Sequence, residues 1–235
     1  MHSDLDLINL NSIRSKKEEL KNEIIETPTI PLSSSFLNKI LPSKNIFLKL
    51  ELFQYTGTFK ARGALSVCNA IEDEKKSYGI TASSAGNHAI AAAWAGNKLG
   101  LSAKVVMRST ANPYRVSLTK SYGAEILIVD NVEELFKEAD KIVREEGRTF
   151  VHPFEGVNTT LGTAGVGLEF IESIPDLDAV VVSIGGGGLI SGVASAIKNI
   201  KPNCKVYGVE PVGANSMYLS FIKGGPLKNL NPKTI

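Results

Sequence analysis

The sequence has few cysteines, no surplus of charge of either sign and no dense run of basic residues, and each absence excludes a class of protein. Its 235 residues include two cysteines, Cys68 and Cys204, which lie far apart and form no CxxC pair. They are expected to be free thiols in a reducing compartment, so the chain is not a disulfide-rich secreted domain. The 26 basic and 24 acidic side chains leave a formal net charge of +2. No nucleic-acid partner is therefore expected.

Signals for secretion and for a membrane span are also lacking. The first ten residues are acidic and contain no apolar core of a secretory leader. Residues 179–197 carry no charge over 19 positions, which approaches the length of a membrane-spanning helix. Four consecutive glycines at 185–188 make a helix through this stretch unfavourable, so a buried strand, a turn and a new helix are predicted instead. A cytoplasmic protein with no membrane partner is expected.

Strand-like and helix-like patterns alternate along most of the chain and predict an α/β fold. Strands are predicted at 46–52, 79–83, 103–107, 125–129, 149–152, 179–184 and 205–210, and helices at 13–25, 59–74, 87–99, 113–122, 132–146, 161–174 and 189–199. Strands that are apolar throughout and alternate with helices are typical of a parallel sheet covered on both faces. Trp94, within an alanine-rich helix, is expected in the core.

Lys60 is the first residue that can carry chemistry. It is expected in the first turn of a helix capped by Thr58. The positive end of the helix dipole and the nearby Arg62 both disfavour an ammonium there, and so favour the neutral amine that forms a Schiff base. The alternative interpretation is a solvated lysine at a helix end, the commoner situation for this residue type.

Two further segments lead from a strand into a helix, where free backbone amides favour an anion. In the first, Ser84 and Asn87 add polar side chains, which suits a carboxylate; a capped turn is the alternative. In the second, the glycines 185–188 let several amides converge on a phosphate, with a closely packed turn as the alternative. Their spacing fits neither the P-loop nor the GxGxxG fingerprint. The histidines His2, His88 and His152 show no metal-ligand spacing, so no zinc site is predicted.

Taken together, these segments resemble the pyridoxal-phosphate enzymes of fold type II, and within them the threonine dehydratase and serine racemase group. The resemblance runs from about Thr27 to Ile235. Its markers, in chain order, are TP at 27–28, LKLE at 48–51, TFKARGA at 58–64, SAGNHA at 84–89, HPF at 152–154, the glycines at 185–188 and GVEP at 208–211. Each marker is weak alone, but their order and spacing together are specific.

The resemblance implies a fold and an assembly. The fold would be a three-layer parallel-sheet α/β fold of the tryptophan synthase β-like kind, with two lobes and without its C-terminal part. Residues 1–78 and 155–235 would form a large cofactor-binding lobe, and residues 79–154 a small lobe. Ligands would bind between them, at the carboxyl ends of the strands. Because members of the family are usually oligomers, a homo-oligomer is expected.

The resemblance also implies a role for each matching residue. Lys60 would bind pyridoxal 5'-phosphate as a Schiff base and then remove the substrate Cα proton. Phe59 would pack beside the pyridine ring, and Asn87 would hydrogen-bond the phenolic oxygen of the cofactor. The phosphate would be held by Gly185, Gly186, Gly187 and Gly188, and the substrate carboxylate by Ser84, Asn87 and His88.

The expected activity is a β-elimination that converts L-threonine or L-serine to a 2-oxo acid and ammonia. Three alternatives stay open at this point. The first is a dehydratase for another β-hydroxy amino acid, such as 3-hydroxyaspartate. The second is an inactive fragment that binds the cofactor or an amino acid. The third, a nucleotide-binding Rossmann domain with Glu210 as ribose ligand, is disfavoured by the glycine spacing.

Departures from the family pattern refine these expectations. Serine racemase-like members carry a second base, a serine, where this chain has Ala85, so elimination is expected over racemisation. Glu210 and the Ala214 carbonyl match positions that bind a divalent cation in some members, but Ser216 replaces the second acidic residue, and no metal is predicted. Residues 162–165 depart from the usual Gly-Gln-Gly-Thr. The sequence stops at Ile235, short of the usual length, so the group facing the pyridine nitrogen is not identified.

Overall fold

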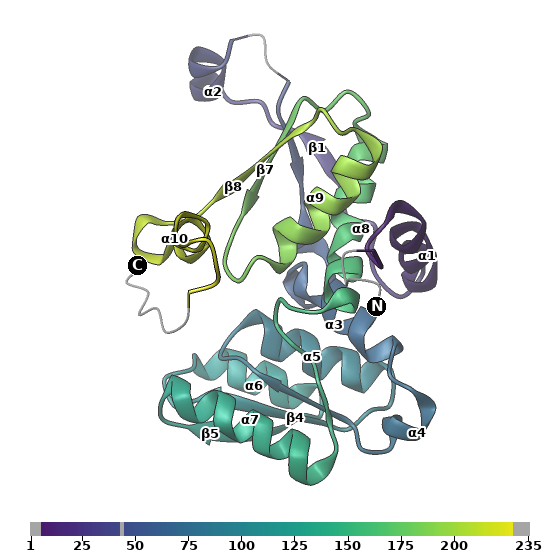
Figure 1. The fold of residues 1–235 in the computed structure, drawn as a ribbon, viewed down its shortest axis with the longest axis vertical. Coiled ribbons are helices and arrows are strands. Elements are labelled where there is room, and N and C mark those ends of the chain that lie inside the picture. The colour runs from purple at the N-terminus through teal and green to yellow at the C-terminus, as the bar shows by residue number, and fades with distance from the viewer. Residues whose placement is uncertain (1–5, 43–44, 228–235) are drawn as a thin grey trace.

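The computed structural model describes residues 6–42 and 45–227, and it is an α/β fold built around parallel strands (Figure 1). The helices are α1 (Leu10–Leu20), α2 (Ser35–Ile40), α3 (Lys60–Asn69), α4 (Asp73–Lys76), α5 (Asn87–Lys98), α6 (Pro113–Ser121), α7 (Val132–Glu146), α8 (Val157–Ser173), α9 (Gly188–Ile200) and α10 (Ser216–Lys223). The strands are β1 (Thr29–Pro31), β2 (Phe47–Lys49), β3 (Ile80–Ser83), β4 (Ala103–Arg108), β5 (Glu125–Val129), β6 (Thr149–Phe150), β7 (Ala179–Ser183) and β8 (Lys205–Val209).

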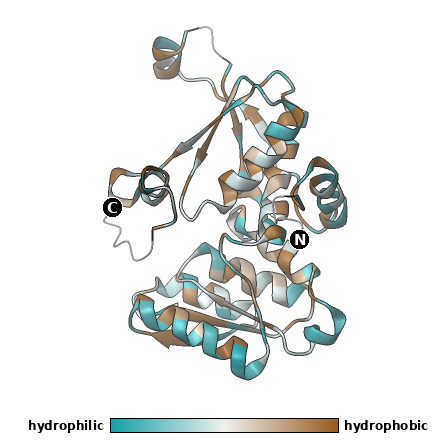
Figure 2. Cartoon of the chain, viewed as in Figure 1, coloured by the Kyte–Doolittle hydropathy of each residue, from teal (hydrophilic) through white to brown (hydrophobic). Residues whose placement is uncertain are grey.

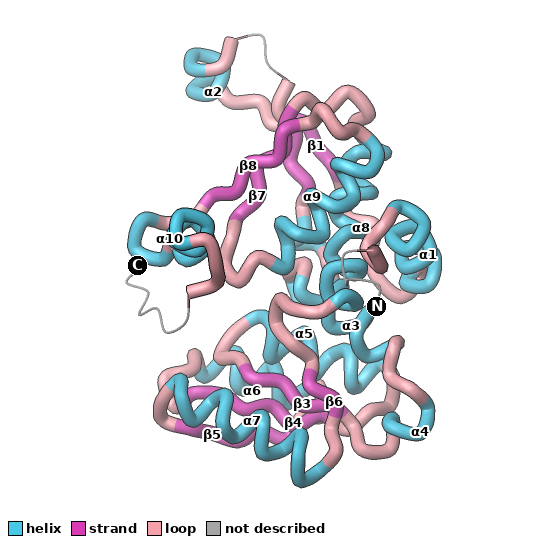
Figure 3. Tube along the Cα trace, in the orientation of Figure 1, coloured by secondary structure: helices cyan, strands magenta, loops and turns pink. Residues whose placement is uncertain are grey.

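A four-stranded parallel sheet in the order β5-β4-β3-β6 forms one half of the molecule (Figure 3). Successive side chains of a strand point to opposite faces. Accordingly, Val105 and Met107 of β4 join the core that includes α5, whereas Val106 packs with Leu135 and Ile142 of α7. Both faces of this sheet are therefore covered, as its apolar strands predicted. Figure 2 shows its strands in brown and much of α7 in teal.

The second parallel pair, β7 and β8, is covered on one face among the described residues. Val180 and Val182 of β7 pack against α9 through Val193. The residue between them, Val181, is 69% exposed. The prediction of a fully buried strand at 179–184 is thus wrong for alternate residues, because α8 and α9 supply apolar side chains to one face only. The expected strand, turn and helix over 179–197 are confirmed.

Helix α8 is the central element, and it packs against α3, α9 and α1. Small residues allow these close contacts. A Cβ added to Gly162 would lie 2.6 Å from the carbonyl oxygen of Arg62 on α3, and one added to Gly192 on α9 would lie 2.3 Å from the Thr163 hydroxyl. Tight helix packing thereby explains the glycines at 162 and 192.

Several boundaries differ from those predicted. The strand predicted at 46–52 shortens to β2, which pairs antiparallel with β1 and is followed by the 3-10 turns Glu51–Phe53 and Tyr55–Gly57. The helix predicted at 59–74 ends at Asn69, and a separate α4 follows. Helix α2 was not predicted, although Ser34 caps it by accepting from the Leu37 amide. Such local caps are hard to recognise without tertiary context.

The remaining global expectations are met in part. Trp94 is buried and stacks on Tyr55 with ring centroids 5.2 Å apart. Both cysteines are free and buried. Within residues 6–42 and 45–227, each helix is too short or too polar to cross a membrane. The lobe boundaries at 78/79 and 154/155 stay a prediction, and residues 228–235 of the last segment lie outside the described residues, as does His2.

Candidate active site

Lys60 is the first residue of α3, and the chain reaches it through a strained turn. Thr56 and Gly57 have φ angles of 62° and 71°, in the left-handed region that a threonine rarely adopts. The Thr58 hydroxyl accepts a hydrogen bond from the Lys60 amide over 3.3 Å. Thr58 thus satisfies a free helix amide, as predicted, although Phe59 separates it from the helix.

The Lys60 side chain is withdrawn from water. Its Nζ donates to the carbonyl of Pro153 and lies 5.1 Å from the Phe59 ring centroid. Burial lowers the pKa of Lys60 to about 8, so the predicted shift towards a neutral amine is confirmed. The predicted contribution of Arg62 is wrong, because burial causes the shift and the Arg62 guanidinium is paired with Glu51 and Glu169. The predicted contribution of the helix dipole stays a prediction.

Residues 151–154, here called the strap, lead from β6 into α8 and touch both Lys60 and His88. His88 Nε2 donates to the Val151 carbonyl over 2.7 Å, which leaves Nδ1 as an unprotonated ring nitrogen without a partner in the described part of the chain. Burial lowers the pKa of His88 to about 3, so this ring is neutral. Lys60 and His88 line one small cavity together with His152, Thr159 and Gly188.

The glycine run 185–188 joins β7 to α9 and packs against the strap. A Cβ on Gly186 would lie 2.3 Å from the Phe154 ring, and one on Gly188 would lie 2.7 Å from the Phe154 carbonyl oxygen. Close packing therefore explains these two glycines. It does not explain Gly185, around which a Cβ would meet nothing within 4 Å. Among described residues, the amides of 185–187 donate to no backbone carbonyl, so they are free for an anion at the N-terminus of α9.

The three residues predicted to bind the substrate carboxylate do not all lie in the same cavity. His88 lies in the cavity with Lys60, whereas Ser84 and Asn87 do not line it. The Ser84 hydroxyl accepts from the Gly86 amide over 3.2 Å, and Asn87 is exposed at the start of α5. Sequence reasoning missed Arg115, whose Nη1 would lie 3.0 Å from a Cβ on Gly86. No motif singled out this cation, which approaches the turn from α6.

Two more features were missed by sequence reasoning. The hydroxyl of Thr163 on α8 donates to the Gly188 carbonyl, which ties α8 to the glycine run. A cavity of about 790 Å³ lies beside that run, and it is lined by Gly185, Gly186, Phe154 and side chains of α10 such as Met217 and Phe221. Its size falls within the range of small-molecule sites.

Glu210 has a structural role in this structure. Its carboxylate accepts from the amides of Met217 and Tyr218, each over 2.9 Å, and so caps the N-terminus of α10. Ala214 lies in the 3-10 turn Val212–Ala214. Within the described ranges, no cluster of three or more metal-binding side chains occurs. That no metal binds remains a prediction.

Comparison with known proteins gives consistent results. Residues 20–235 match the family described as pyridoxal-phosphate dependent enzyme. The chain is 46% identical over 222 residues to phenylserine dehydratase of Ralstonia pickettii, and 38% identical over 218 residues to a catabolic L-threonine dehydratase of Staphylococcus aureus. These alignments cover 94% and 92% of the chain but 67% and 62% of the relatives, so the chain spans about two thirds of their length or slightly less. The structure of maize serine racemase superposes with a TM-score of 0.89 at 34% identity, covering 96% of this chain and 68% of that one.

Proposed function

Because the chain belongs to the family of pyridoxal-phosphate-dependent enzymes, we propose that it dehydrates a β-hydroxy amino acid to a 2-oxo acid and ammonia, with L-threonine or L-serine as substrate. The names of two relatives, both dehydratases, support this reaction class. The observation that carries the proposal is the desolvated amine of Lys60, which donates to the Pro153 carbonyl in the strap. The following residue of the strap, Phe154, packs on the glycine run.

The residues present fit the cofactor at both of its ends. An aldehyde requires a neutral amine, and the pKa of Lys60 is about 8. A phosphate requires converging donors, and the free amides of 185–187 stand at the positive end of α9. Gly185, Gly186, Gly187 and Gly188 would therefore hold the phosphate, and Lys60 the aldehyde carbon. The bound cofactor supplies the electron withdrawal that acidifies the substrate Cα–H bond.

The other roles belong to this chain's own side chains. With a pKa near neutrality, the Lys60 amine can accept the Cα proton and release it again. Phe59 flanks that amine and would pack against the cofactor ring. Exposed Asn87 would donate to the phenolic oxygen of the cofactor. Ser84, Asn87 and His88 would bind the substrate carboxylate. His88 would do so through its backbone amide in the first turn of α5, because its neutral ring already donates to Val151, and Arg115 adds positive charge beside the same turn.

Reductive trapping tests the proposal directly. The chain is incubated with pyridoxal phosphate, reduced with borohydride, digested and analysed by peptide mass. We expect the cofactor mass on the peptide that contains Lys60, and its loss in Lys60→Met. Lys98→Met serves as control, because Lys98 pairs with Glu23 away from the site. Labelling spread over surface lysines, unchanged in Lys60→Met, would refute the proposed site.

Turnover is measured separately as release of 2-oxo acid from L-threonine and L-serine. Specific labelling of Lys60 without turnover of any β-hydroxy amino acid would instead favour a cofactor-binding fragment. 3-Hydroxyaspartate belongs in the same panel, since it tests an acidic β-substituent against the methyl group or hydrogen of the proposed substrates.

A substrate with an aromatic β-substituent is a second candidate. It is favoured by the apolar cavity that Phe154, Met217 and Phe221 line beside the glycine run, and by the 46% identity to a phenylserine dehydratase. Comparison of kcat/KM for L-threonine and 3-phenylserine decides between the two. If phenylserine is the substrate, Phe221→Ala is expected to lower kcat/KM for phenylserine and to leave that for threonine nearly unchanged.

A further inference from the structure

The segment 54–62, which carries Lys60, is tied at both of its ends to one peptide group. Gln54 Nε2 donates to the Ile25 carbonyl over 2.7 Å, and Arg62 Nη2 donates to the same oxygen over 3.2 Å. We propose that Gln54 and Arg62 are positioning residues, which together bracket this segment and hold the Lys60 side chain against the strap. The inference deepens the proposed function and rests on it for the role of Lys60.

Gln54 and Arg62 together are called the bracket below. In Gln54, both the oxygen and the nitrogen of the side-chain amide form hydrogen bonds. Its Oε1 accepts from the amides of Ile25 and Tyr55, each over 3.0 Å, while its Nε2 donates to the Ile25 carbonyl. The side chain is only 3% exposed. Because the side chain has so little contact with solvent, water does not readily replace these bonds. An apolar side chain of the same size would leave the Ile25 amide without its acceptor, and only Arg62 would still donate to the Ile25 carbonyl.

Arg62 is held from the other side by two carboxylates. Its guanidinium makes two-point contacts with Glu51 (2.8 and 2.9 Å) and with Glu169 of α8 (2.6 and 2.9 Å), and its side chain is 0% exposed. Lys49 adds a second cation at 2.5 Å from Glu169. The charges of the two cations and the two carboxylates therefore cancel. The planar guanidinium of arginine binds both carboxylates at two points each, which the single ammonium group of lysine cannot do.

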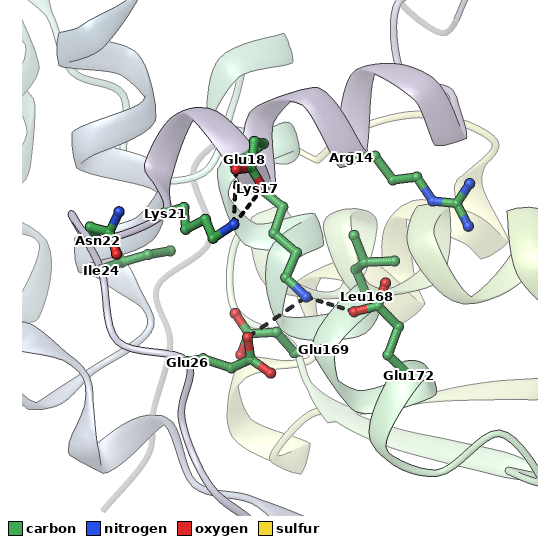
Figure 4. Close-up of a pocket in the computed structure, with 10 residues that line it drawn as sticks. All are labelled: Arg14, Lys17, Glu18, Lys21, Asn22, Ile24, Glu26, Leu168, Glu169 and Glu172. Atoms are coloured by element: carbon green, nitrogen blue, oxygen red, sulfur yellow. Dashed lines mark hydrogen bonds and ion pairs between the residues drawn. The ribbon is translucent and has the colours of Figure 1, made fainter.

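The carboxylate side of this network reaches a hollow of about 630 Å³ between α1 and α8 (Figure 4). Glu169 lines the hollow, where Lys17 lies 2.6 Å from Glu172 and 3.8 Å from Glu26. Burial opposes the charge of Lys17, but the acidic neighbours, Glu169 among them, outweigh it and raise the pKa of Lys17. The partners of Arg62 are themselves paired, because the Thr27 hydroxyl donates to Glu51 over 2.6 Å and Lys49 lies 2.5 Å from Glu169. Both carboxylates therefore hold the Arg62 guanidinium from fixed positions.

A bracket is needed because the backbone inside it is strained. Thr56 adopts φ 62°, a conformation that costs a non-glycine residue energy and persists only where its surroundings impose it. Lys60 follows four residues later as the first residue of α3. Release of either tie lets the turn relax, and α3 then loses the placement that keeps the Lys60 amine at the Pro153 carbonyl.

The test measures the environment of the Lys60 amine without any need for catalysis. The full chain, freed of bound pyridoxal phosphate with hydroxylamine, is labelled with trace acetic anhydride from pH 6 to 11, and acetylation of Lys60 is quantified by peptide mass. In the wild type the midpoint is expected near pH 8. In Gln54→Met and in Arg62→Lys it is expected to move upward, towards the value of 10.5 for a solvated lysine.

Ser66→Ala provides the matched control. Ser66 lies on α3 six residues beyond Lys60, is fully buried, and donates to the Asn158 carbonyl over 2.6 Å, outside the bracket. This variant is expected to lower the melting temperature and to leave the acetylation midpoint unchanged. Gln54→Met places no new charge in the interior, so it keeps the test decisive if Arg62→Lys fails to fold.

The outcomes separate this inference from the proposed function. A midpoint that stays near pH 8 in a folded Gln54→Met protein overturns the bracket, whatever the cofactor does. Failure of the wild type to take up pyridoxal phosphate on Lys60 overturns the proposed function, while the acetylation result still decides whether Gln54 and Arg62 position the amine. A shift of equal size in Ser66→Ala would show a general loosening of α3 and would also overturn the bracket.

Discussion

The hydroxyl of Thr163 donates a hydrogen bond to the carbonyl of Gly188 over 2.8 Å, and this contact joins the centre of α8 to the first residue of α9. Thr163 is 2% exposed, so water does not compete for the bond. The same helix contacts α3, which carries Lys60. Through α8, the residues proposed for the two ends of the cofactor therefore share one rigid support.

Thr163→Val is expected to weaken cofactor binding and stability together. Valine keeps the shape but removes this hydrogen bond, while the Gly188 carbonyl keeps its helical bond at the start of α9, so a loss of about 0.5–1.5 kcal/mol is expected. The control is Thr160→Val on the same helix, whose hydroxyl donates within α8 to the Gly156 carbonyl. Denaturant unfolding and titration with pyridoxal phosphate measure the two effects. Equal losses of affinity in both variants would contradict a special role for Thr163.

The glycine run offers a second test, because its members differ in what surrounds them. Gly188→Ala places a Cβ 2.7 Å from the Phe154 carbonyl oxygen, which belongs to backbone and cannot move aside cheaply. We expect it to lower the free energy of unfolding by about 1–3 kcal/mol. Gly185→Ala meets nothing within 4 Å and is expected to cost less than about 0.5 kcal/mol. Urea unfolding curves decide, and a larger loss in Gly185→Ala would be the contrary result.

The sequence alone predicted the features that are local in the chain. Lys60 at a helix start, the glycines between a strand and α9, and the parallel strands 103–107 and 125–129 all follow from residues that are neighbours in sequence. The contacts that build the site were not predictable in this way. Phe154 on Gly186 and Thr163 on Gly188 join segments 25 to 32 residues apart, and no pattern specifies such a tertiary contact.

Two errors show how tertiary context outweighs local pattern. Val181 was expected inside because its whole strand is apolar, yet the helices that pack on β7 cover only the face of Val180 and Val182. Arg62 was expected to act on Lys60 because it is two residues away. Its charge is instead balanced by Glu51 and Glu169, the latter 107 positions further along the chain.

Ala85 predicts the balance between elimination and racemisation. Inversion at Cα requires a second base on the face opposite Lys60, and alanine has no proton to exchange. From L-serine, wild-type protein is expected to release pyruvate with no measurable D-serine, and Ala85→Ser to raise the ratio of D-serine to pyruvate. Chiral chromatography of the reaction gives this ratio. Rapid formation of D-serine by the wild type would show that another group serves as the second base.

His88 predicts a loss of stability in acid. Its pKa is lowered to about 3 in the folded chain by burial, against 6.5 for an exposed histidine. Between these values the unfolded chain binds more protons, so the free energy of unfolding falls as the pH drops from 6.5 towards 3. His88→Gln, which retains a donor for the Val151 carbonyl but does not titrate, is expected to lose less stability over this window. Urea unfolding of both proteins at pH 7 and pH 4.5 measures how much stability each loses. If the His88 ring is solvated, the wild type and His88→Gln should lose the same amount.

Lys60 predicts how uptake of the cofactor depends on pH. Only the neutral amine attacks an aldehyde, and a pKa of about 8 leaves about a tenth of the lysine neutral at pH 7 and about nine tenths at pH 9. The second-order rate of pyridoxal phosphate capture, followed by absorbance, is therefore expected to rise about tenfold over this range and then level off. A solvated lysine would instead show a continued tenfold rise per pH unit up to about pH 10. A rate that keeps rising beyond pH 9 would mean that the amine is not desolvated, and the geometry at the Pro153 carbonyl would then not describe the reactive state.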